Sequence, residues 1–263
     1  MTEILFHLIN YWAVMAIFML GLWAWQLKTG DAGIADVGWA YGIAAGVLYF
    51  SLVGDGDSGR KILAACMGIG WGLRLGTYLL IDRIIKAKEE DGRYQNFRKA
   101  AGENVKRYFF LFFQAQAFVA VLFVIPLAIV SYNSEPLGRM YALAILIWII
   151  SIGGEWTADK QLAKFRMDES NKGKVCRNGL WRYSRHPNYF FEWVHWWSYV
   201  VLGWGAGYGW ITLAGPCVMM LFLLKISGIP FTEQQALKTK GEEYKKYLET
   251  TNMFFPWPPK DAK

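Results

Sequence analysis

The stretch Phe109–Val130, FFLFFQAQAFVAVLFVIPLAIV, carries no charged residue. Its length matches the roughly 20 residues that an α-helix needs to cross the hydrocarbon core of a bilayer. The whole chain shares this bias, since 54% of its 263 residues are hydrophobic, 14 are Trp and 17 are Phe, and the mean hydropathy is +0.19. Soluble domains are less apolar than this. Lipid is therefore the expected solvent for much of the chain.

Six further apolar runs predict an all-α bundle of about seven transmembrane helices. With Phe109–Val130 included, the seven runs in chain order are Ile4–Leu27, Ile34–Val53, Ile62–Ile81, Phe109–Val130, Met140–Trp156, Tyr189–Trp204 and Trp210–Ile229. The first run lacks a basic segment before it and a small-residue cleavage pattern, so we expect it to remain as a span. No linker or repeat is visible. We therefore expect one membrane domain over residues 1–263, with substrate-side helices in residues 1–130 and a cofactor-binding part in residues 140–263.

Basic residues are divided unevenly between the predicted loops. With the N-terminus outside, the inner segments hold 23 Lys and Arg residues and the outer loops hold three. Such an excess is typical of cytoplasmic loops, so it predicts an outer N-terminus and a cytoplasmic C-terminus. The net charge of +7 then reflects loops that face anionic lipid headgroups, and nucleic acid is not an expected partner. The expected location is the inner membrane of a bacterium or the endoplasmic reticulum of a eukaryote.

Metal and disulfide chemistry are not indicated. Cys66, Cys176 and Cys217 lie far apart and form no C-x-x-C pair, and the three histidines show no ligand spacing. The sequence also lacks a P-loop and a G-x-G-x-x-G turn. A nucleotide site would therefore have to be built between helices.

Two basic residues lie inside predicted spans, Arg74 in WGLRLGTYLL and Lys225 in LFLLKISGIPF. Ionisable groups at that depth are costly, so they are expected to face a polar interior and to be paired. Lys225 has the alternative of reaching the membrane surface with its long side chain. The candidate acidic partners are Asp36, Glu155, Asp159 and Glu192.

The polar stretch GLWRYSRHPNYF, Gly179–Phe190, separates two apolar regions. Before it, Glu155 and Asp159 share a helix face if the fifth helix continues. After it, a second stripe begins at Asn188 and continues through Glu192. Cations fill the loop between, and a mixture of cations, amides and carboxylates suits a dinucleotide. The alternative is an ordinary membrane interface, where Arg, Trp and Pro also gather without an enzymatic role.

The segment GLWRYSRHPNYFFEWVHWWSY, with EWTADKQLAKFR before it and EEYKKYLETTNMFFPWPP after it, resembles the steroid 5-alpha-reductase C-terminal domain family. The resemblance is closer to its bacterial branch, DUF1295, which also shows patches similar to ADVGWAYG, WGLRLGTYLLIDR and EEDGRYQNFR. Isoprenylcysteine carboxyl methyltransferases, in the wider superfamily, carry a similar R-H-P-x-Y and a segment similar to TEQQALKTKGEEYKKY, Thr232–Tyr247.

The resemblance implies that NADPH is the cofactor and that polar side chains of the second half hold it. These are Glu155, Asp159, Arg166, Lys174, Arg185, His186, Asn188, Tyr189, Glu192, Lys225 and Tyr244. At the substrate end the family's Q-E-x-P-S patch is missing. By rough alignment Asp36 takes the place of its glutamate and Trp71 that of its tyrosine, three residues before Arg74. A standard 3-oxo-steroid is therefore not the expected substrate.

The expected reaction, like that of 3-oxo-5-alpha-steroid 4-dehydrogenases, moves a hydride to the double bond of an enone in a steroid-like or other lipid substrate. A protonated Asp36 would stabilise the enolate, with Arg74, Tyr41 or Tyr78 as other candidates, or Asp36 would be the structural partner of Arg74. The patch around Arg93 would close over the cofactor or form a surface helix. Two other readings stay open, an S-adenosylmethionine-dependent methyltransferase and a non-enzymatic lipid-binding or scaffolding protein.

Overall fold

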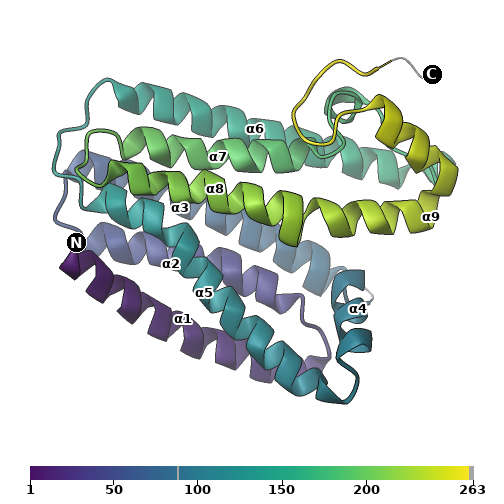
Figure 1. The fold of residues 1–263 in the computed structure, drawn as a ribbon, viewed down its shortest axis with the longest axis horizontal. Coiled ribbons are helices and arrows are strands. Elements are labelled where there is room, and N and C mark those ends of the chain that lie inside the picture. Colours follow the sequence, from purple (N-terminus) through teal and green to yellow (C-terminus); the bar gives the residue numbers. More distant parts are fainter. Residues whose placement is uncertain (88, 261–263) are drawn as a thin grey trace. The chain divides into compact units, whose positions relative to one another are not determined.

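A computed structural model describes residues 1–87 and 89–260, and all regular structure in those residues is helical. The confirmed all-α architecture is shown in Figure 1. The α-helices are α1 (Thr2–Thr29), α2 (Ile34–Val53), α3 (Ser58–Leu79), α4 (Gly92–Ala101), α5 (Val105–Ser131), α6 (Met140–Met167), α7 (Pro187–Leu202), α8 (Ala214–Leu221) and α9 (Ile229–Thr250). π-Helical turns follow α3 at Leu80–Ile85 and α8 at Phe222–Ile226. Short 3-10 turns occupy Gly102–Asn104, Glu169–Asn171, Gly179–Arg182 and Gly209–Leu213.

Six helical segments of the described chain are long and apolar enough to cross a membrane. They are Thr2–Thr29, Ile34–Val53, Ser58–Ile85, Gly92–Ser131, Met140–Met167 and Gly209–Thr250. The protein is therefore a multi-pass integral membrane protein. The remaining predicted span, Tyr189–Trp204, corresponds to α7, which is helical as expected but only 16 residues long. Its length alone does not establish a seventh crossing.

The chain forms two compact units, Met1–Gly138 with Leu202–Gly215, and Arg139–Val201 with Pro216–Lys263. In the first unit, α2 packs against α1 and α3, and α5 packs across α1 and α2. Figure 1 shows the short helix α4 turned away from the direction of these long helices. The segment Leu202–Gly215 had been expected in the cofactor-binding part. It belongs to the first unit because its 3-10 turn packs against α5.

Glycines allow the helices of the first unit to approach closely. A Cβ atom at Gly72 of α3 would lie 2.9 Å from both the Ala40 carbonyl oxygen and the Ala44 Cβ of α2. One at Gly46 of α2 would lie 2.7–2.8 Å from side chains of α5 and α1. Helices in lipid lack a hydrophobic driving force between them, so close packing over small residues is a main source of their attraction.

Arg60 ties the segment Leu202–Gly215 into this unit. The side chain is only 6% exposed and donates hydrogen bonds to the carbonyl oxygens of Glu135, Pro136 and Leu202. The Asp57 side chain accepts from the Arg60 N–H and caps α3. A buried guanidinium is costly unless its donors are used, and three carbonyl groups use them here.

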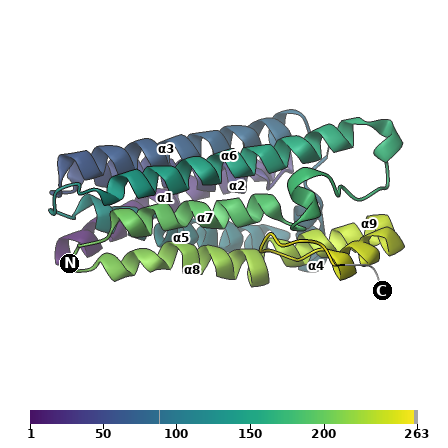
Figure 2. The ribbon, with the colours of Figure 1, turned by 90° about the horizontal axis from the view of Figure 1, so that it is seen from above.

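The second unit contains α6, α7, most of α8, and α9. Figure 2 shows α6, α7 and α8 side by side, with α9 continuing beyond α8. A Cβ atom at Gly154 of α6 would lie 2.4–2.5 Å from the ring of Phe191, so α6 and α7 pack closely at this point. The helix α6 continues past the predicted end of its apolar run at Trp156, to Met167. This confirms the condition under which Glu155 and Asp159 share a face.

Gly72→Ala should lower the free energy of unfolding by about 1–3 kcal/mol, because a methyl group there meets backbone and Cβ atoms of α2 and overpacks the contact. The matched control is Gly21→Ala in α1, where a Cβ atom would have no neighbour within 4 Å. That variant should be neutral or slightly stabilising, since Ala favours a helix. Thermal unfolding in detergent measures both. Equal midpoints for the two variants would contradict this packing.

Candidate functional site

The polar residues that flank the loop between α6 and α7 meet in the second unit. Pro187 begins α7, a position where its missing N–H costs nothing and its fixed φ suits a helix. The next residue, Asn188, donates from Nδ2 to Asp159 Oδ1 of α6 at 3.2 Å, and its own Oδ1 accepts from the Tyr189 N–H at 3.0 Å. Asn188 and Asp159, two of the predicted cofactor residues, are therefore in contact.

Two further predicted site residues are buried carboxylates one helical turn away from this contact. Glu155 lies on α6 four residues before Asp159 and is 6% exposed, and Glu192 lies on α7 four residues after Asn188 and is 8% exposed. Glu192 accepts a hydrogen bond from Trp196 Nε1 at 3.3 Å. Buried acids in apolar helices are costly, and they commonly mark functional sites.

The loop before α7 is held by Glu233 of α9, which the sequence analysis did not single out. Arg185 Nε donates to Glu233 Oε1 at 2.8 Å, and His186 Nε2 lies 3.1 Å from the same oxygen. Arg185 is 9% exposed and His186 is 2% exposed. The only sequence signal for Glu233 was its place in the segment similar to the methyltransferases.

The same arginine also fastens the C-terminal tail. Its Nη1 donates to the carbonyl oxygens of Leu248 at 3.2 Å and Thr251 at 2.5 Å. The ring of His186 stacks on Tyr189, whose hydroxyl lies 3.3 Å from Thr232 Oγ1. The polar atoms of Arg185 and His186 are thus used within the protein. This favours an anchoring role for both over the predicted contact with a cofactor.

The other predicted cofactor residues differ in exposure. Arg166, Lys174 and Lys225 are exposed, and Lys225 lies in the π-helical turn Phe222–Ile226. Tyr244 is 5% exposed and packs with Val175 and Tyr247 in a small apolar cluster, which favours a packing role. Arg166 and Lys174 remain available to an anion.

At the substrate end, Asp36 is held by three donors. Its carboxylate forms ion pairs with Arg83 and with Arg93 Nη2, the second at 2.9 Å, and accepts from the Tyr94 hydroxyl at 2.7 Å. The sequence suggested Arg74 as a structural partner of Asp36, and Arg83, Arg93 and Tyr94 are partners that the structure adds. All three donate to Asp36, so the carboxylate acts as an acceptor and not as the proton donor that the expected mechanism requires.

The patch EEDGRYQNFR leads into and forms most of the short helix α4, in which Tyr94 is the buried residue and the others are partly or fully exposed. Tyr94 is 1% exposed, and Asp91 accepts from the N–H and the Nε of Arg93 at 2.9 and 3.2 Å. Burial alone would raise the pKa of Asp91. The charge and hydrogen bonds of Arg93 lower this pKa by more than burial raises it, so the pKa lies below the ordinary value. This patch holds Asp36 through a charged network.

The remaining predicted catalytic residues lie on α3. Trp71 is 1% exposed, and its ring contacts Trp39 edge to face at 6.0 Å. Trp39 in turn meets the ring of Phe123 on α5 at 5.2 Å. Trp71 therefore belongs to the aromatic core of the first unit, and Arg74 lies partly buried one turn further along the helix.

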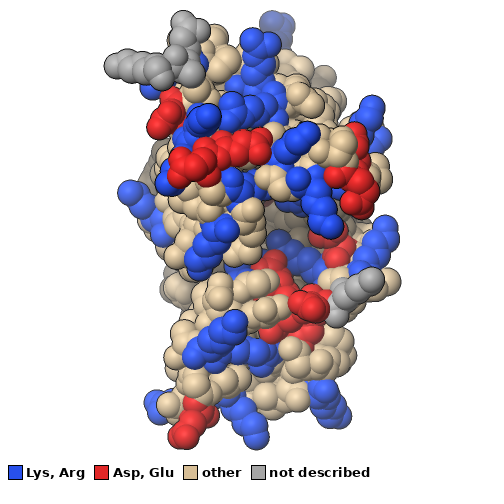
Figure 3. Space-filling view, turned by 90° about the vertical axis from the view of Figure 1, so that its right-hand side faces the viewer, with Lys and Arg blue, Asp and Glu red and all other residues tan. Residues whose placement is uncertain are grey.

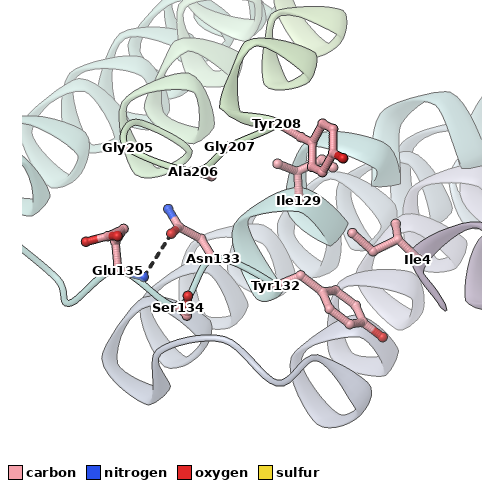
Figure 4. A pocket seen from close by; sticks show the side chains of 10 residues that line it. All are labelled: Ile4, Ile129, Tyr132, Asn133, Ser134, Glu135, Gly205, Ala206, Gly207 and Tyr208. Carbon is pink, nitrogen blue, oxygen red and sulfur yellow. Dashed lines mark hydrogen bonds between the residues drawn. The ribbon is translucent and has the colours of Figure 1, made fainter. Parts of the chain in front are cut away.

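A small cavity lies in the first unit, as Figure 4 shows. Its volume is about 130 Å³, and its lining residues are Ile4, Ile129, Tyr132, Asn133, Ser134, Glu135, Gly205, Ala206, Gly207 and Tyr208. Pockets for drug-sized ligands have volumes of roughly 300–1,000 Å³. This cavity is too small for a dinucleotide, and it contains none of the predicted site residues.

Figure 3 shows a face on which Lys and Arg side chains gather, with Asp and Glu side chains between them. In the part of the chain that the structure describes, no group of three or more His, Cys, Asp or Glu residues is placed to hold a metal ion.

Unfolding should be easier in acid because of His186. Burial lowers the pKa of His186 below its ordinary value near 6.5, although the Glu233 carboxylate acts in the opposite direction. The unfolded chain therefore takes up the proton first, and stability falls as the pH drops below about 6.5. The thermal midpoint should drop less between about pH 7.5 and pH 5.5 in His186→Gln than in the wild type. Parallel pH profiles for the two proteins would refute this.

Comparison with known proteins identifies the family of this chain. The family model described as "Protein of unknown function (DUF1295)" matches residues 22–251. No curated protein and no solved structure matches the chain. Because this match covers most of the 263 residues, the chain belongs to the DUF1295 family.

Proposed function

We propose that this protein is a membrane-embedded, NADPH-dependent reductase that acts on a carbon–carbon double bond conjugated to a ketone in a lipid-like substrate. The observation that carries the proposal is the hydrogen bond between Asn188 and Asp159, which joins α6 and α7 beside the buried Glu155 and Glu192. These are the positions at which the resemblance to the steroid 5-alpha-reductase family implies cofactor contacts.

The chemistry of this group of residues fits a nicotinamide dinucleotide. Carboxylates such as Asp159 accept hydrogen bonds from ribose hydroxyls, and a side-chain amide such as Asn188 both donates and accepts. Arg166 and Lys174 are exposed cations, which suit phosphate oxygens. Arg185 contributes by positioning, because its bonds to Glu233 and to the tail fix the loop that leads into α7.

The bound cofactor supplies the hydride, and the protein has to stabilise the charge that develops on the substrate oxygen. Asp36 is engaged as an acceptor by three donors, so we no longer assign the proton-donating role to it. The hydrogen-bond donor is then Arg74, Tyr41 or Tyr78. Of these, Tyr41 has its hydroxyl 3.0 Å from Thr77 Oγ1, and Tyr78 is 49% exposed.

We also propose the finer topology, with seven crossings, an outer N-terminus and a cytoplasmic C-terminus. The helix α7 would be the short seventh crossing. The distribution of Lys and Arg between the loops supports this orientation, because cytoplasmic loops are enriched in both residues.

A methyltransferase that uses S-adenosylmethionine is the second candidate. It is favoured by the bonds of Arg185 and His186 to Glu233, because these join the R-H-P motif to the segment that resembles isoprenylcysteine carboxyl methyltransferases. The first candidate accounts better for the exposed cations, since adenosylmethionine carries no phosphate.

Purified full-length protein in detergent should bind NADPH and not S-adenosylmethionine. Asn188→Ala and Asp159→Asn should each weaken NADPH binding by roughly tenfold, the effect of losing about 1.4 kcal/mol of hydrogen bonding. Titration calorimetry, with a ligand-induced rise in the thermal midpoint as a second readout, measures the binding.

Asn104→Ala is the matched control, because Asn104 is exposed and its side chain makes no cap hydrogen bond. It should bind NADPH like the wild type. Binding of S-adenosylmethionine in place of NADPH would reject the reductase and favour the second candidate.

The orientation is tested by reporter fusions in a bacterial host. A green fluorescent protein fused to the C-terminus should fluoresce, and alkaline phosphatase at the same place should be inactive, because the C-terminus is expected in the cytoplasm. Active alkaline phosphatase at the C-terminus would reverse the proposed topology.

A further inference from the structure

The cavity in the first unit has a different chemistry from the candidate nucleotide site. Its polar side chains are those of Tyr132, Asn133, Ser134, Glu135 and Tyr208, and none of the lining residues in the described part of the chain is Lys or Arg. Figure 4 shows Glu135 and Asn133 on one side of the cavity and the two tyrosine rings on the other. A cavity lined by a carboxylate and aromatic rings suits a cation.

The cavity lies where membrane-spanning segments end. Its lining includes Ile4 near the start of α1 and Ile129 near the end of α5, and the lining residues 205–208 come directly before the segment Gly209–Thr250. All three helical segments are long and apolar enough to cross a membrane. Lipid headgroups lie at the level where such helices leave the hydrocarbon core, so a headgroup can reach this cavity.

The carboxylate of Glu135 is not used within the protein. The side chain is exposed, and among residues 1–87 and 89–260 it belongs to no hydrogen bond or ion pair. The backbone of Glu135 makes its bonds, since the carbonyl oxygen accepts from Arg60 Nε and the N–H donates to Asn133 Oδ1, both at 3.0 Å. The charge of Glu135 acts on Arg60, but the donors of that guanidinium are already used by carbonyl groups. The carboxylate is therefore available to a cation in the cavity.

Further carboxylates lie near the tyrosine side of the cavity. The Tyr132 hydroxyl donates to Glu3 Oε1 at 3.4 Å. Burial raises the pKa of Tyr132 to about 12, and the negative charges of Glu3 and Asp55 contribute to this rise. Negative charge is thus found on both sides of the cavity, in a chain whose net charge is +7.

Hydrogen bonds hold the walls of the cavity in place. Asn133 is 3% exposed, and its carbonyl oxygen accepts from the Asp57 N–H at 2.9 Å. The neighbouring Ser131 carbonyl oxygen accepts from the Gly56 N–H at 3.1 Å. The loop after α5 is therefore tied to the loop before α3, and a ligand can bind without first ordering these residues.

We infer that this cavity binds an ammonium group on a short polar stem, the chemistry shared by the headgroup of phosphatidylethanolamine and by free ethanolamine. A primary ammonium group carries one positive charge and three N–H donors, which match the Glu135 carboxylate and the oxygens of Asn133 and Ser134. The faces of the Tyr132 and Tyr208 rings attract the same charge. The volume of about 130 Å³ is several times the roughly 30 Å³ that a water molecule occupies in the liquid, so a group of a few heavy atoms fits. The inference uses no residue of the candidate nucleotide site and does not depend on the reductase proposal.

The test uses native mass spectrometry of the full-length protein in detergent, with equal amounts of phosphatidylethanolamine and phosphatidylglycerol. The wild type should retain more phosphatidylethanolamine, although its positive net charge alone would favour the anionic lipid. Glu135→Gln should reduce this preference by roughly threefold or more, because the neutral amide no longer attracts the ammonium group. Glu103→Gln is the matched control, since it removes an exposed carboxylate of the same unit that does not line the cavity. It should keep the preference of the wild type.

Variants of Tyr208 test the aromatic side. Tyr208→Leu should reduce the preference by roughly two- to fivefold, the effect of losing one cation–π contact. Tyr208→Phe keeps the ring and should retain the preference. Tyr208 is 49% exposed, so both variants should fold, and thermal midpoints without added lipid check this.

Free ethanolamine separates the two sources of the ammonium group. A rise in the thermal midpoint with ethanolamine, present in the wild type and absent in Glu135→Gln, would show that the free amine binds. No rise, together with the lipid preference, would assign the cavity to the headgroup. The inference is overturned if the wild type shows neither the lipid preference nor the rise, or if Glu135→Gln behaves like the wild type in both measurements.

Discussion

A single carboxylate organises the second unit. Glu233 accepts from Arg185 and lies against His186, while Arg185 also donates to carbonyl groups near the C-terminus. One side chain of α9 thereby fixes the loop before α7 and the tail together. Because Arg185 is only 9% exposed, removing Glu233 would leave its charge with little compensation, which destabilises the fold. Because Pro187 follows this anchored loop, the first turn of α7 is positioned and Asn188 meets Asp159.

A carboxylate with charged partners on other segments is also found in the front half of the chain. Asp36 lies in the first turn of α2 and forms a network with Arg83 and Arg93. Pairing makes such charges tolerable near lipid. A charged residue in a membrane protein can thus be retained for the connection it makes. In both units, charged residues that are conspicuous in the sequence join separate segments of the chain.

Hydropathy predicted the helices well because lipid imposes a length and a composition on every crossing. The predicted run Ile34–Val53 coincides with α2. Hydropathy could not show that α6 continues to Met167, because the last turns of that helix are polar and do not follow the apolar pattern. The sequence placed Asp159 and Asn188 among the cofactor residues on either side of one loop, but it did not predict the hydrogen bond between them.

Other contacts could not be anticipated from sequence alone. Glu233 is 48 residues from Arg185, and no periodicity or spacing links the two. For the same reason the sequence did not show that Arg83 and Tyr94 are partners of Asp36. Each of the two lies 47 or more residues from Asp36 in the chain. Local patterns report which groups are present. Which of them remain free for a ligand depends on pairings that only the fold defines.

Hydrogen–deuterium exchange of the full-length protein with and without NADPH tests the central claim most directly. The account predicts slower exchange in the peptides that carry the end of α6 and the start of α7, around Asp159 and Asn188, with little change in α1. Unchanged exchange in those peptides at saturating NADPH, or protection confined to the first unit, would contradict it.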